Sequence, residues 1–186
     1  MNILIVYGTA EGQTQKIASF MANIFHENGH NVVTANATEN PPTPEEFDAI
    51  LIGSSIHLHK FKSSIKSYIK ENLMGLNEKL TGFFSVSLAM ASNNPEEHEA
   101  VKEITTSFLS KLNWKPKHIY HMAGALKFSK YDYLKKMTMR TIAKKERPGE
   151  EIDINLDYEY TDWKKVETQT LNFAESLQKL KLHEQT

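Results

Sequence analysis

The sequence predicts an α/β protein built on a doubly wound parallel sheet of five strands. Short apolar runs such as Ile3–Tyr7 and Ala49–Ile52 have the uninterrupted, β-rich character of strands buried on both faces. Segments with helical apolar spacing separate these runs, so strands and helices alternate along the chain. With 186 residues, 40% of them apolar and 24% charged, the chain suits one packed domain, residues 1–186.

The first half of the chain supplies three of the expected strands. Ile3–Tyr7 ends at Gly8, and a helix closed by Gly29 follows it. The apolar positions that mark one side of this helix are Ile17, Phe20, Met21, Ile24 and Phe25. A second strand is expected at Val32 and Val33. A brief helix with capping-box spacing is then expected at residues 43–46, before the third strand, Ala49–Ile52, which ends at Gly53.

The second half repeats the alternation. A helix carrying Ile65, Tyr68, Ile69 and Leu73 precedes the fourth strand, Phe83–Val86. A further helix opens at Asn94-Pro95, and the fifth strand is His118–Met122. The last helix begins near Trp163. Its expected inner residues are Val166, Leu171, Ala174, Leu177 and Leu180.

The topology predicts where a ligand would bind. For five such units the expected strand order is 2-1-3-4-5, which places a crevice at the carboxyl ends of the first and third strands. Three loops meet there: residues 8–14, 54–61 and 87–94.

A long insertion, about residues 127–159, interrupts the alternation after the fifth strand. Residues 127–147 carry eight Lys or Arg and two acids, whereas residues 150–162 carry six acids and no cation. The segment exceeds an ordinary connection of about two to six residues. A charged, solvated helix paired with its own acidic segment would account for this pattern as well as a functional element would.

Composition excludes several classes of protein. A formal net charge of −1 gives no general attraction to nucleic acid, and the absence of cysteine excludes disulfides and Cys-ligated metals. No apolar run approaches the roughly 18 residues of a membrane span. We therefore expect a cytoplasmic protein with no nucleic-acid partner.

The loop after the first strand has the features of a phosphate site. It joins a buried strand to a helix N-terminus, where unpaired amides and the helix dipole favour an anion. Thr9 and Thr14 add hydroxyls, and Gly12 permits close approach of the backbone. No lysine lies within the loop, so neutral donors would hold the phosphate. A plain strand-to-helix turn fits this segment equally well.

The loop, Tyr7-Gly8-Thr9-Ala10-Glu11-Gly12-Gln13-Thr14, resembles the FMN phosphate loop of flavodoxins, roughly Ser/Thr-x-Thr-Gly-x-Thr. The resemblance extends to the flavodoxin-like, menaquinone-dependent protoporphyrinogen oxidases, which also carry a long insertion at this place. The other segments that resemble this family are Gly53-Ser54-Ser55-Ile56, Phe84-Ser85-Val86-Ser87-Leu88, Ala123-Gly124-Ala125-Leu126 and Tyr160-Thr161-Asp162-Trp163. The resemblance implies a flavodoxin-like fold and bound FMN.

The resemblance also implies the cofactor-binding residues. These are Thr9, Ala10, Glu11, Gly12, Gln13 and Thr14 at the phosphate, and Ser54, Ser55, Ile56, His57, Ser87, Leu88 and Ala89 at the ring. Flavodoxins usually have hydroxyls where Ala10 and Glu11 stand. Because a carboxylate would repel a phosphate, we expect the Glu11 side chain to point to solvent.

The implied reaction removes six electrons from protoporphyrinogen in three two-electron steps through FMN to a quinone, a step of heme biosynthesis. Five insertion cations are candidates for binding the substrate's propionates or an anionic membrane surface: Lys127, Lys130, Lys135, Lys136 and Arg140. On this interpretation the flavin would stay bound without residues 127–159.

Other functions stay open at this point. An electron-transfer flavodoxin without substrate chemistry of its own is one alternative, although such proteins are usually more acidic and cover the flavin with aromatic rings. A flavin-free interaction module on the same fold is another. His57 and His59 have no third ligand at suitable spacing, so we expect no metal site.

Overall fold

The computed structural model describes residues 1–183, apart from the side chains at positions 146 and 180–183. Five parallel strands form its main sheet in the order β2-β1-β3-β5-β6. Their bounds are β1 (Asn2–Gly8), β2 (Asn31–Asn36), β3 (Ala49–His57), β5 (Leu80–Ser87) and β6 (His118–Ala123). Because β5 and β6 are the fourth and fifth parallel strands, the predicted order 2-1-3-4-5 is confirmed.

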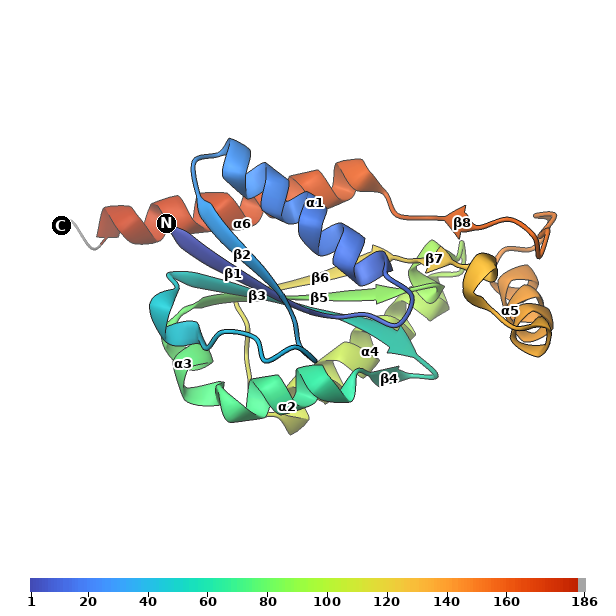
Figure 1. Ribbon diagram of the computed structural model, residues 1–186, viewed down its shortest axis with the longest axis horizontal. Coiled ribbons are helices and arrows are strands. Elements are labelled where there is room, and N and C mark those ends of the chain that lie inside the picture. The colour runs from blue at the N-terminus through green and yellow to red at the C-terminus, as the bar shows by residue number, and fades with distance from the viewer. Residues whose placement is uncertain (184–186) are drawn as a thin grey trace.

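Helices cover both faces of this sheet (Figure 1). α1 (Gln13–Glu27) and α6 (Trp163–His183) lie on one face. α2 (Ser63–Glu71), α3 (Leu73–Glu78) and α4 (Pro95–Lys111) lie on the other. Each face has its own apolar core, since alternate strand residues point to opposite sides.

Most of the predicted inner face of α6 is buried. Val166, Ala174 and Leu177 are in the core, and Leu171 is half-buried. Phe173, which is not among the predicted inner residues, is also fully buried. Leu180 lies outside the residues whose side chains the structure describes.

The end of α1 and the short element before β3 lie where the sequence predicts them, but the predicted capping box is incomplete. Gly29 has a φ of +78° and follows α1, as a glycine C-cap should. Residues Pro44–Glu46 form one 3₁₀ turn, η1, but the Thr43 side chain makes no capping hydrogen bond to its backbone. So short an element leaves the capping box incomplete.

β3 is longer than the sequence predicts, because it continues past Gly53 to His57. Beyond the main sheet it turns back as a hairpin with β4 (Lys60–Phe61). The turn residues Leu58 and His59 have φ values of +48° and +60°. Such two-residue turns favour Gly or Asn, so the local sequence gives no indication of this hairpin.

The insertion folds as a small unit of its own. β7 (Ala125–Leu126) pairs antiparallel with β8 (Tyr158–Glu159). Between them lie η3 (Phe128–Lys130) and α5 (Tyr133–Glu146), the only long helix of this unit within the described residues. A third apolar cluster includes Leu126, Phe128, Tyr131, Ala143 and Ile152.

A part-buried polar pair joins β5 to β6. The hydroxyl oxygen of Ser85, a fully buried residue, lies 2.7 Å from Nδ1 of His121. Burial, with Lys102 and Lys165 adding repulsion, lowers the pKa of His121 to about 4. The folded protein therefore holds this ring neutral at pH values at which the unfolded chain binds a proton.

This pair predicts a pH dependence of stability. As the pH falls from about 6.5 towards 4, the unfolded state gains a proton at His121 that the folded state resists, so the free energy of unfolding falls. His121→Asn keeps a polar atom for Ser85 and should lose less stability over this range in urea titrations. Equal losses in the two proteins would contradict the assignment.

Candidate functional site

The carboxyl ends of the strands carry a row of polar residues. The strand register aligns Gly8 with Ser54, Ser54 with Ser85, and Ser85 with His121. The loops that follow β1, β3 and β5 leave the sheet at this edge, at the right of Figure 1. This edge, at the carboxyl ends of the first and third strands, is therefore the candidate ligand site.

The loop between β1 and α1 has the conformation of an anion-binding turn. Gly12 has a φ of +98°, a conformation that residues with a side chain rarely adopt. The Gly12 amide donates to the Thr9 hydroxyl over 2.9 Å. In the first turn of α1, Thr14 Oγ1 and Gln13 Oε1 are buried with no hydrogen-bond partner among the described residues. Such orphaned groups indicate that a polar ligand completes the site.

Glu11 differs from its predicted orientation. Its side chain is only 11% exposed and does not point to solvent, because the insertion covers it. The Tyr131 hydroxyl donates to Glu11 Oε2, and Lys135 Nζ lies 3.0 Å from Oε1. Burial, together with the Glu11 carboxylate, raises the pKa of Tyr131, so this hydroxyl stays protonated and keeps donating.

The insertion also brings lysines to a loop that contains none in its own sequence. Lys130 Nζ donates to the Glu11 carbonyl oxygen over 3.0 Å. With Lys135 it places two ammonium groups beside residues 9–14, although the loop's own sequence supplies only neutral donors. Sequence separations of 119 and 124 residues hide these contacts from motif reading.

The segment that follows the insertion braces the other side of the loop. Gln13 Nε2 donates to Thr161 Oγ1, which donates to the Ala123 carbonyl oxygen, each over 2.8 Å. Lys16 pairs with Glu159 at 2.5 Å. Both ends of the insertion thus contact the first turn of α1 or the loop before it.

The β3 and β5 loops provide the remaining predicted residues. Ser55 and Ser87 are buried, and their hydroxyls have no partner among the described residues. Ser54 is also buried, but its oxygen accepts a hydrogen bond from the Lys62 amide. Ile56, Leu88 and Ala89 are half-buried at this edge.

His57 ends β3 beside these loops. Desolvation lowers the pKa of His57 although its side chain still reaches solvent, and the Glu11 carboxylate opposes the shift. The ring is therefore neutral at pH 7 and can both donate and accept a hydrogen bond.

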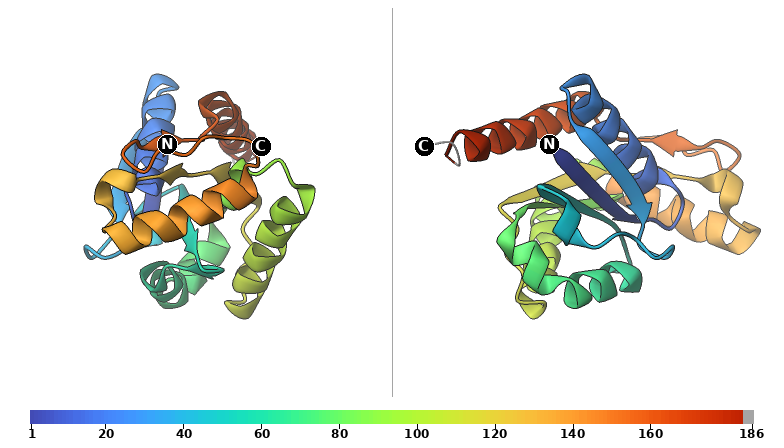
Figure 2. Two further views of the ribbon diagram at one scale, coloured as in Figure 1. Left: turned by 90° about the vertical axis from the view of Figure 1, so that its right-hand side faces the viewer. Right: turned by 60° about the vertical axis from the view of Figure 1, so that its left-hand side comes forward.

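α5 crosses the carboxyl end of the sheet (Figure 2, left). Near its start Lys135 contacts Glu11, and just past its end Arg147 donates to the Ala91 carbonyl oxygen over 3.4 Å. The helix therefore bridges the loops after β1 and β5. Lys136 and Arg140 share the helix face of the buried Ala143, between these two anchors.

The five candidate cations of the insertion have different surroundings. Lys127 pairs with Asp157 at 3.7 Å, in agreement with an acidic segment that neutralises part of the basic one. Lys130 and Lys135 contact Glu11. Lys136 and Arg140 are half-buried, and Arg140 Nε is buried with no partner among the described residues.

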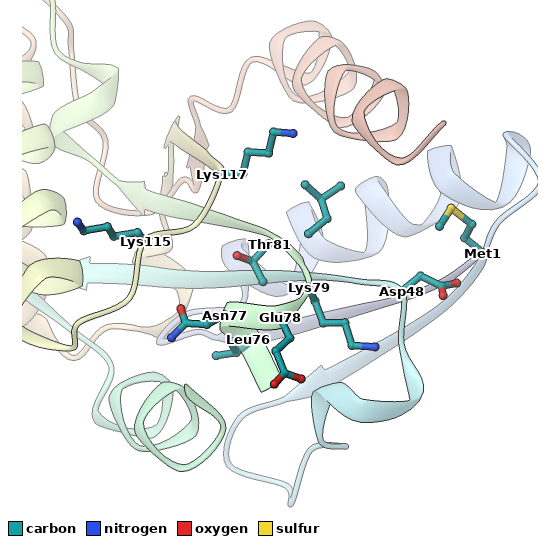
Figure 3. A pocket seen from close by; sticks show the side chains of 10 residues that line it. Met1, Asp48, Leu76, Asn77, Glu78, Lys79, Thr81, Lys115 and Lys117 are labelled. Carbon is teal, nitrogen blue, oxygen red and sulfur yellow. The ribbon is translucent and has the colours of Figure 1, made fainter. Parts of the chain in front are cut away.

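A surface hollow lies at the opposite end of the sheet. Its lining includes Asp48, Glu78, Lys79, Lys115 and Lys117 (Figure 3). These residues precede the strands or lie at their amino ends, and none of the predicted site residues is among them. Ligands of open parallel sheets bind at the carboxyl ends, so we assign this hollow no function.

Among the side chains that the structure describes, no group of three or more His, Cys, Asp or Glu is arranged to hold a metal ion. None of the helices within residues 1–183 combines the length and the apolar character that crossing a bilayer requires.

Comparison with known proteins decides the family. Residues 4–152 match the Flavodoxin domain family. The chain belongs to the flavodoxin family. It is 30% identical over 179 residues to protoporphyrinogen IX dehydrogenase [quinone] of Escherichia coli (strain K12), covering 95% of this chain and 94% of that protein. It is 26% identical over 176 residues to the protein of the same name from Leishmania major, covering 92% and 74%.

A solved structure supports the fold. A flavodoxin from the domain Archaea superposes with a TM-score of 0.55 at 14% identity, covering 96% of this chain and 99% of that one. For this flavodoxin-family protein, the family implies a flavin. The open glycine turn, the orphaned Thr14, Ser55 and Ser87 hydroxyls and the two nearby ammonium groups fit a phosphorylated flavin at this edge.

The contact between the loop and the insertion predicts a stability effect. Glu11→Gln removes a buried charge that bonds Tyr131 and Lys135, and should lower the free energy of unfolding by about 1–2 kcal/mol in urea titrations. Glu151→Gln, an exposed carboxylate in the acidic segment, is the control and should change little. Equal effects of the two substitutions would show that Glu11 does not anchor the insertion.

Proposed function

We propose that this protein is an FMN-dependent oxidoreductase that oxidises protoporphyrinogen IX to protoporphyrin IX and passes the electrons to a quinone. The observation that carries the proposal is the position of α5 across the predicted flavin edge, anchored to the loops after β1 and β5. The similarity to quinone-dependent protoporphyrinogen IX dehydrogenases spans 95% of the chain and so includes the insertion.

Separate groups of residues would bind the phosphate and the ring of the flavin. When bound, the flavin supplies the redox chemistry by accepting electron pairs from the porphyrinogen and giving them to the quinone. Residues 9–14 would hold its phosphate, and the backbones of residues 54–57 and 87–89 would flank its ring. Hydrogen bonds from these groups would tune the ring's potential, and the neutral His57 ring would serve as a hydrogen-bond partner.

Two cations are the best placed to bind the substrate. Lys136 and Arg140 lie one helical turn apart on the half-buried face of α5. Neither has a carboxylate partner among the described residues. A guanidinium binds a carboxylate through two parallel hydrogen bonds. We assign these two residues to the propionates of the porphyrinogen.

The test is an anaerobic assay of the flavin-loaded protein with protoporphyrinogen IX and a menaquinone analogue. We expect turnover, and Arg140→Gln should raise the KM for the porphyrinogen roughly tenfold without changing the KM for the quinone or the flavin content. Lys144→Gln, an exposed position near the end of the same helix, is the matched control.

The same assay separates the alternatives. Bound flavin that cycles between redox states without oxidising porphyrinogen would favour an electron-transfer flavodoxin. A purified protein that binds no flavin would leave only an interaction module on this fold.

We propose a cytoplasmic location with peripheral contact at the inner membrane. The outer side of α5 exposes Tyr133, Leu134 and Met137 among basic residues, a composition that suits an anionic bilayer surface. We expect cosedimentation with phosphatidylglycerol vesicles, reduced in Leu134→Glu. Binding that is absent, or unchanged in this variant, would contradict the contact.

A further inference from the structure

Lys130 is an uncompensated charge at the turn before α1. Its ammonium group is exposed and donates one hydrogen bond, to the Glu11 carbonyl oxygen. No carboxylate among the described residues pairs with it, whereas Lys135 is paired with Glu11 and Lys127 with Asp157. An ammonium group has three donors, so two remain for a ligand.

The position of Lys130 coincides with the bare side of the glycine turn. A Cβ added at Gly12 would meet, within 4 Å, only Lys130 Nζ, at 3.6 Å, among the atoms beyond its chain neighbours. Glycine at a φ of +98° leaves that side of the backbone open to close approach. The opening made by Gly12 is therefore bordered by the ammonium group of Lys130.

A second observation points to an anion at the same turn. Thr14 is 1% exposed, and its hydroxyl has no hydrogen-bond partner among the described residues. This hydroxyl lies in the first turn of α1, where unpaired amides also favour negative charge. An ammonium group without a carboxylate partner among the described residues, an orphaned hydroxyl and a helix N-terminus thus lie at one loop.

Charge balance explains why a cation is needed here. The Glu11 carboxylate lies beside the loop and would repel a phosphate. Lys135 neutralises this carboxylate, which leaves the charge of Lys130 available to the ligand. Without Lys130 the site would have to hold a doubly charged phosphate with neutral donors alone.

We propose that Lys130, a residue of the insertion, binds the phosphate of the flavin nucleotide. This inference rests on the proposed function, because it assumes that the nucleotide occupies the loop. It gives the insertion a role in cofactor selection as well as in substrate binding. It also makes flavin retention depend on residues 127–159, which the sequence alone presents as separable from the flavin site.

The experiment compares FMN with riboflavin, which has the same ring but no phosphate. The apoprotein and its Lys130→Met variant are titrated with each flavin, with quenching of flavin fluorescence as the measure of Kd. We expect Lys130→Met to weaken FMN binding roughly tenfold and to leave riboflavin binding unchanged. Lys130→Arg should retain most of the FMN affinity, since it keeps the charge.

Controls distinguish this role from a structural one. Lys144→Met removes an equal charge from an exposed position near the end of α5 and should leave both affinities unchanged. The loss of FMN affinity in Lys130→Met should shrink as salt is added. Thermal unfolding checks that each variant is folded.

Several results would overturn the proposal. Equal weakening of FMN and riboflavin would make Lys130 a brace for the loop, and an unchanged FMN affinity would exclude it from the site. Wild-type protein that does not discriminate between the flavins would show that the phosphate is not recognised. If wild-type protein binds neither flavin, the proposed function itself fails, which is a different result from failure of the variant alone.

Discussion

The carboxylate of Glu11 joins the first loop of the sheet to a segment more than a hundred residues later. It is nearly buried, and the Tyr131 hydroxyl and the Lys135 ammonium group both bond to it. A buried carboxylate without these partners would be costly. Together with the contacts of Gln13 with Thr161 and of Arg147 with Ala91, this contact positions the insertion over the ligand edge.

Much of the fold was predictable because its causes are local. Strands such as Ile3–Tyr7 are apolar throughout since helices cover both faces of the sheet, and Gly29 ends its helix through backbone geometry. The hairpin at Leu58 and His59 was not predictable, because these residues carry none of the usual preferences of a turn with positive φ.

The site was only partly predictable for the same physical reason. Residues 9–14 could be proposed as a phosphate loop because a strand, a turn and a helix N-terminus are adjacent in sequence. Glu11 and Lys130 contact segments that are distant in sequence, and a surface charge in a sequence gives no indication of its partner. A carboxylate at Glu11 would repel a phosphate, but the insertion places the cations Lys130 and Lys135 beside it.

On our proposal, residues 9–14, braced by the insertion, hold the phosphate of a flavin nucleotide. A crystal structure of the protein with FMN tests it most directly. We expect phosphate density against the amides of residues 9–14, with the contacts from Glu11 to Tyr131 and Lys135 intact. A phosphate bound elsewhere, or an insertion displaced from the loop when FMN binds, would contradict it.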